Sequence, residues 1–118
     1  MRRIVYGVRR AVVLAATLTV LMAPPGAEAA RSCKPVENPY SGTRYEGVDL
    51  TRILAARVPC RTARRVAKGA HAKALGLTPP ADGIRRFTWK GWKVTGNLRP
   101  SSDRYLATKG AKRVRWRF

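Results

Sequence analysis

The sequence predicts an α+β domain in which one amphipathic helix packs on a small antiparallel β-sheet. Over residues 60–76, apolar side chains recur with the period of an α-helix. From Ile84 to Phe118, apolar and polar side chains alternate instead, as in strands with one buried face. The helical stripe is mostly alanine, so it needs a surface of larger side chains, which the apolar face of the sheet can supply.

We expect the helix to span Cys60–Gly76. Gly69 in its middle costs about 1 kcal/mol relative to alanine, which indicates close packing at that point. Pro59 suits a helix start, and Gly76 is expected to be the C′ glycine that ends the helix. The expected buried stripe comprises Ala63, Val66, Ala67, Ala70, Ala74 and Leu77.

The carboxy-terminal part predicts hairpins. A two-residue turn at Lys90-Gly91 would pair Trp89 with Trp92 and Phe87 with Val94. A later turn at Lys109-Gly110 leads into a strand that alternates throughout. Its apolar face has Val114, Trp116 and Phe118, and its polar face has Arg113, Arg115 and Arg117.

Residues 31–58 are less regular. The turn-rich segment 31–47 shows no period and is expected to be an ordered loop. Residues 48–55 fit either a strand or a capped helical turn, and we favour the strand because Val48, Leu50 and Arg52 alternate.

Residues 1–29 have the three parts of a secretory signal peptide: four arginines, the uncharged run 11–23, and a small-residue cleavage region. We expect cleavage after Ala29 or Ala30, leaving one secreted domain over residues 30–118. A transmembrane anchor is disfavoured because the run 11–23 is shorter than the roughly 20 residues that a span needs. Lipoprotein and twin-arginine signals fit the surrounding residues poorly.

Export predicts a disulfide between Cys33 and Cys60, the two cysteines of the chain. In the chain-entropy model, closing this loop stabilises the fold by about 3.5 kcal/mol. Cys60 as a catalytic thiol at a helix amino terminus is the less favoured alternative.

The segment Val58-Pro59-Cys60-Arg61-Thr62-Ala63-Arg64-Arg65-Val66-Ala67, with Gly91-Trp92-Lys93-Val94 and the basic terminal strand, resembles a loose group of small secreted proteins of high-GC Gram-positive bacteria. These share a V-x-C-x-x-A-R-x-V-A segment. The resemblance implies a compact, cysteine-stapled α+β domain and no particular activity. It also implies that Val94 and Ala107 stand where such proteins often carry a further cysteine pair.

Few residues suit catalysis or metal binding. His71 is placed at the edge of the helical stripe and is expected to have no role, because no carboxylate is positioned in sequence to orient it. A small ribonuclease using His71 with Glu37 or Glu46 is the sharpest enzyme alternative, although no motif supports it. We expect no catalytic residues, no metal site, no cofactor and no enzymatic activity.

Charge remains as the functional signal. Residues 1–29 hold four arginines and one glutamate, so removing them from 25 basic and 6 acidic residues leaves 21 and 5, a net charge of +16. We expect a monomer that associates with an anionic polymer, such as a wall polymer or non-specific nucleic acid. The alternative is a structural envelope protein whose arginines form a solvated face. The candidate anion-binding residues are the strand row Arg113, Arg115 and Arg117 and the helix patch Arg61, Arg64, Arg65 and Lys68.

Overall fold

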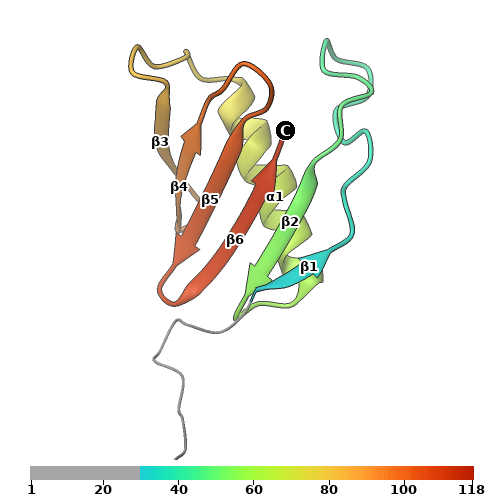
Figure 1. Cartoon of the computed structure of the whole chain (residues 1–118), viewed down its shortest axis with the longest axis vertical. Coiled ribbons are helices and arrows are strands. Elements are labelled where there is room, and N and C mark those ends of the chain that lie inside the picture. The colour runs from blue at the N-terminus through green and yellow to red at the C-terminus, as the bar shows by residue number, and fades with distance from the viewer. Residues whose placement is uncertain (1–29) are drawn as a thin grey trace, which may run out of the picture.

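The computed structural model describes residues 30–118, which form the predicted α+β fold with one helix on an antiparallel sheet (Figure 1). The expected signal peptide, residues 1–29, lies outside the described residues. The elements are β1 Arg31–Cys33, β2 Thr51–Ala56, α1 Cys60–Leu75, β3 Ile84–Trp89, β4 Trp92–Asn97, β5 Arg104–Lys109 and β6 Lys112–Arg117.

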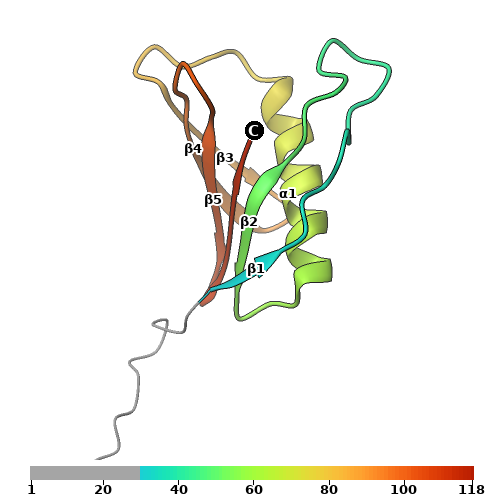
Figure 2. The same ribbon diagram turned by 45° about the vertical axis from the view of Figure 1, so that its right-hand side comes forward.

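The sheet has the strand order β1-β2-β6-β5-β4-β3, and all of its pairs are antiparallel. Strands β3 to β6 form a meander. The two strands that precede the helix, β2 and β1, extend the sheet beyond β6. The last strand is therefore inside the sheet rather than at its edge. Seen from the side, α1 covers one face only, so that sheet and helix form two layers (Figure 2).

The alanine stripe of α1 packs against the large side chains of the sheet, as predicted. The buried residues of the helix include Ala63, Ala67, Ala70 and Ala74, each 0% exposed. Across from them lie Trp92, Val94, Tyr105, Ala107, Val114 and Trp116, all buried. Small residues on the helix let its backbone approach these aromatic rings closely.

Gly69 is the closest point of that approach. A Cβ atom at this position would lie 2.1 Å from Cζ2 of Trp89, which is closer than atoms can pack. The predicted reason for a glycine inside the helix is therefore confirmed. Gly76 follows the last helical residue, as expected, but it is the C-cap and not a C′ glycine with a left-handed backbone: its φ is −91°, and its N–H donates to the Lys73 carbonyl at 3.1 Å. The helix ends by tightening its last turn, without a positive φ.

The β3–β4 hairpin has the predicted register. Trp89 pairs with Trp92, and Lys90 and Gly91 both have positive φ, 47° and 85°, as a type I′ turn requires. The β5–β6 turn lies one residue later than predicted, at residues 110–111, since Lys109 pairs with Lys112. Val94 and Ala107 face each other directly across β4 and β5.

The amino-terminal part corrects one expectation and confirms another. Residues 31–33 were expected in a loop but form the edge strand β1, which pairs with β2. This pairing is not visible as a period because it covers only Arg31–Cys33. Residues 51–56 form a strand, as favoured over the helical turn.

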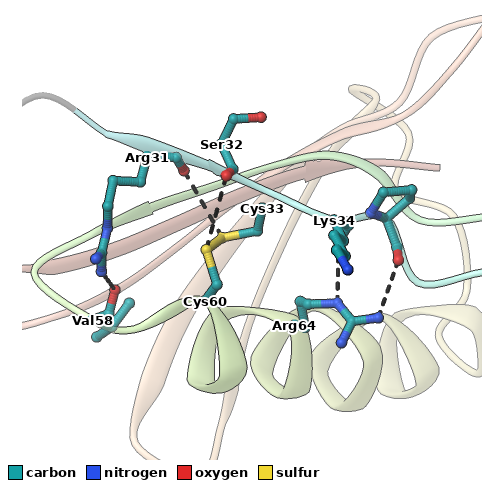
Figure 3. The surroundings of a disulfide bond; sticks show 8 residues. Arg31, Ser32, Cys33, Lys34, Val58, Cys60 and Arg64 are labelled. Atoms are coloured by element: carbon teal, nitrogen blue, oxygen red, sulfur yellow. Dashed lines mark hydrogen bonds between the residues drawn. A yellow bond between two sulfur atoms is a disulfide. The ribbon is translucent and has the colours of Figure 1, made fainter.

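The disulfide between Cys33 and Cys60 joins β1 to the first residue of α1, with Cα atoms 5.5 Å apart (Figure 3). Nearby, the Arg64 guanidinium donates to the carbonyls of Lys34 and Pro35, each at 3.1 Å. Arg31 donates to the Val58 carbonyl at 2.6 Å. The disulfide therefore ties β1 to α1, and the three hydrogen bonds tie residues 31–35 to the helix and to the turn that precedes it.

Candidate anion-binding face

The face of the sheet turned away from α1 is basic, and we call it the open face. Residues paired directly across strands share a face, so the outward position of Arg115 places its cross-strand partners Leu106 and Leu54 there too. The outward residues of β3 to β6 are Ile84, Arg86, Thr88, Lys93, Thr95, Asn97, Arg104, Leu106, Thr108, Arg113, Arg115 and Arg117.

The predicted arginine row lies on this face. Arg113 and Arg115 are exposed and Arg117 is partly exposed, while Val114 and Trp116 between them are buried under the helix. Alternate residues of a strand lie about 6.8 Å apart, so the row presents regularly spaced guanidinium groups.

Within residues 30–118, no acidic residue lies in a strand or in α1. The acidic residues of the described part of the chain are all in the connections between elements: Glu37, Glu46, Asp49, Asp82 and Asp103. Several of these carboxylates accept backbone N–H groups instead of pairing with the open face, including Asp49 from Asn38 at 2.8 Å and Glu46 from Gly42 at 3.0 Å.

Asp82 forms an ion pair with an arginine of the open face. Its carboxylate accepts the backbone N–H of Ile84, which holds the pKa of Asp82 below its usual value, and it pairs with Arg86 at 3.4 Å. Arg86 belongs to the edge strand β3, so this pair leaves the arginines of the central strands unbalanced.

A hollow of about 360 Å³ opens in this face at β2, β6 and β5. Its rim includes four arginines from three strands: Arg52, Arg104, Arg115 and Arg117. Two of these, Arg52 and Arg104, were not among the residues predicted from the sequence. Arg104 could have been found by pairing β5 with β6 across their turn, because it lies opposite Arg117.

Arg52 reaches the hollow because of an irregularity in β2. The register between β2 and β6 shifts between Thr51 and Leu54, and Arg52 has a positive φ of 51°. This is a β-bulge, which inserts one extra residue and re-aims its side chain. The alternation of Val48, Leu50 and Arg52, from which the strand was predicted, would place Arg52 on the same face as Leu50, which is 0% exposed. The sequence interpretation therefore could not place Arg52 on the open face.

The second predicted patch, on the helix, is less free than expected. Arg61, Arg65 and Lys68 are exposed. Arg64 is half-buried, and its guanidinium is bound to the two backbone carbonyls described above. Arg64 therefore fastens the amino-terminal segment to α1 and is poorly placed to hold a ligand.

His71 corrects the sequence interpretation. It was expected at the edge of the stripe without a role, but it is 0% exposed and its Nδ1 accepts the indole N–H of Trp116 at 3.1 Å. Its ring lies 4.1 Å from that of Phe118. Burial, and to a lesser degree the charge of Arg85, lower the pKa of His71 to about 3. His71 is thus a neutral core residue that orients Trp116.

Within residues 30–118, no group of three or more His, Cys, Asp or Glu side chains could hold a metal ion. Over the same residues, no helix is long and apolar enough to span a bilayer. Comparison with protein-family models, curated proteins and solved structures finds no match for this chain. The site therefore has to be interpreted from its own geometry.

Proposed function

We propose that this is a secreted, non-enzymatic basic protein that associates electrostatically with anionic polymers at or outside the cell envelope. The open face carries this proposal. It gathers the arginines of β5 and β6 on one surface, while no acidic residue lies in a strand of the described part of the chain.

The layered fold explains why the open face suits this role. The helix covers the other face, so the arginine row lies on a broad sheet surface that a polymer can approach without rearrangement. Arginine binds phosphate and sulfate groups with two parallel N–H donors, and displacement of counterions from the polymer adds favourable free energy.

The test compares two triple variants of equal charge. Arg113, Arg115 and Arg117 are changed together to glutamine, and the control changes Arg61, Arg65 and Lys68 on the exposed back of α1. Retention on heparin and on teichoic acid is then measured across a salt series. We expect the open-face variant to elute at lower salt than the control, with a shallower salt dependence, because it forms fewer ionic contacts.

Equal retention of the two variants would show that the strand row binds no better than the helix patch and has no special part. If the unchanged protein is not retained at physiological salt, the proposal fails, and the alternative of a structural envelope protein is favoured.

A further inference from the structure

The four arginines around the hollow are arranged across the strands rather than along one of them. Arg104 and Arg117 are direct cross-strand partners on β5 and β6, and Arg52 and Arg115 also line the hollow. The remaining lining residues are Ser32, Leu54, Tyr105 and Trp116. Adjacent strands are about 4.8 Å apart, so this arrangement is denser than the row along β6. Arg113, by contrast, pairs with Thr108 and Ala56 and is outside the rim.

This arrangement carries a cost in the free protein. Like charges directly opposite each other on two strands are destabilising. The charges of Arg104 and, to a lesser extent, Arg52 contribute to lowering the pKa of Arg117, which reports the same repulsion. Arg52 also has a left-handed backbone conformation, with φ 51°. This conformation is energetically unfavourable for any residue other than glycine.

Among residues 30–118, no acidic residue lines the hollow, so no carboxylate of the described chain offsets these costs at the rim. Strained backbone conformations and crowded like charges persist where a function selects them. A bound anion would attract all four guanidinium groups and so offset the repulsion among them. The bulge at Arg52 would then serve to bring a fourth guanidinium group to the anion.

We propose that this hollow is a binding site for a compact anion with adjacent phosphate groups, of the diphosphate type. Guanidinium groups match phosphate oxygens in pairs, and four of them around one hollow suit a ligand that concentrates its charge. The hydroxyl-bearing Ser32 on the rim offers a further donor type, and Leu54 limits the polar contacts on that side. This inference rests on the proposed function because it uses the open face, but it specifies the hollow as the binding site and a diphosphate-type anion as the ligand.

The first experiment measures binding of inorganic pyrophosphate to the purified protein by calorimetry at fixed ionic strength, with sulfate as the reference anion. Arg104→Gln and Arg117→Gln are compared with Lys93→Gln, which removes the same charge from an exposed position of the same face outside the hollow. We expect the two rim variants to weaken pyrophosphate binding about tenfold or more and the control by less than about twofold. Equal weakening in all three variants, or binding no tighter than that of sulfate, would overturn the site.

A second variant, Arg52→Gly, removes one guanidinium together with the strained conformation. We expect weaker pyrophosphate binding while resistance to urea is unchanged or higher, because glycine adopts a positive φ without strain. Loss of affinity in a protein of full stability cannot come from misfolding. Retained affinity would exclude Arg52 from the site and contradict the role of the bulge.

Long-chain polyphosphate, tested at the same phosphate concentration, separates the two sources of this chemistry. Much tighter binding that also depends on Arg113 would identify a polymer that extends from the hollow along the row. If polyphosphate binds no more tightly than pyrophosphate and its binding does not depend on Arg113, the ligand is a small diphosphate compound. Binding independent of Arg104 and Arg117 would contradict the site.

The two proposals fail separately. Pyrophosphate binding without retention on heparin or teichoic acid removes the polymer function and keeps the site. Polymer retention, combined with pyrophosphate binding that does not depend on Arg104 and Arg117, contradicts the site and leaves the polymer function standing.

Discussion

The two faces of the sheet show how one strand serves two purposes. On β6, Val114 and Trp116 are 0% and 1% exposed beneath the helix, whereas Arg113 and Arg115, which alternate with them, are exposed. The covered face holds large side chains at close packing, so its residues determine stability. No segment of residues 30–118 covers the open face, and its arginines repel one another, so we expect them to contribute to binding rather than to stability. Neighbouring residues on the same strand should therefore respond differently to substitution.

The largest difference is expected between Trp116→Ala and Arg115→Ala. Trp116 is almost fully buried, and its indole N–H donates a hydrogen bond to His71. Its truncation to alanine should therefore lower the free energy of unfolding by about 3–5 kcal/mol. Arg115→Ala should change it by no more than about 0.5 kcal/mol, because the side chain is exposed. Urea titrations of the two variants measure both values, and similar losses would mean that the open face is also part of the stable core.

The covered face also predicts a pH dependence through His71. The pKa of His71 is about 3 in the folded protein and near 6.5 in the unfolded chain, so between these values only the unfolded chain gains a proton. Stability is therefore full above pH 6.5 and falls as the pH falls, by about 2 kcal/mol at pH 5.

Unfolding of the His71→Gln variant at pH 7, 6 and 5 provides the control, since glutamine does not titrate. Its unfolding free energy should change less over this range than that of the unchanged protein, whatever its absolute stability. Parallel pH profiles would show that His71 is not the group responsible.

A smaller effect is expected where the helix approaches the sheet. In Gly69→Ala the added methyl group overlaps with the ring atoms of Trp89. The substitution should lower the free energy of unfolding by about 1–3 kcal/mol, because the ring has to move. Gly76→Ala is the matched control, because its φ is −91° and the nearest atom, the Lys73 carbonyl oxygen, is 3.6 Å from the added carbon. Thermal unfolding should show a clear loss for Gly69→Ala and little or no loss for Gly76→Ala.

Much of the fold could be predicted because its elements are regular. The period of residues 60–76 identified α1, and the alternation after Ile84 identified the hairpins and both faces of β6. The turn at Lys90-Gly91 fixed a register, since a two-residue turn leaves one pairing for Trp89. The edge strand β1 escaped prediction because it is too short to show a period.

The candidate site was only partly predictable. The arginine row of β6 followed from alternation within one strand, but the rim of the hollow also needs Arg104 and Arg52 from two other strands. Arg104 depends on strand pairing, and Arg52 depends on a bulge. Arg64 was predicted as a free cation, yet it binds carbonyls of a segment about thirty residues away in sequence.

The sequence by itself determined which side chains share a face, because the periods of helix and strand are local properties of the backbone. It also determined the excess of positive charge. Only the tertiary structure decided that His71 would be a buried acceptor for Trp116, and that arginines from three strands would surround one hollow. These outcomes depend on strand order and register, which are set by contacts between segments distant in the chain.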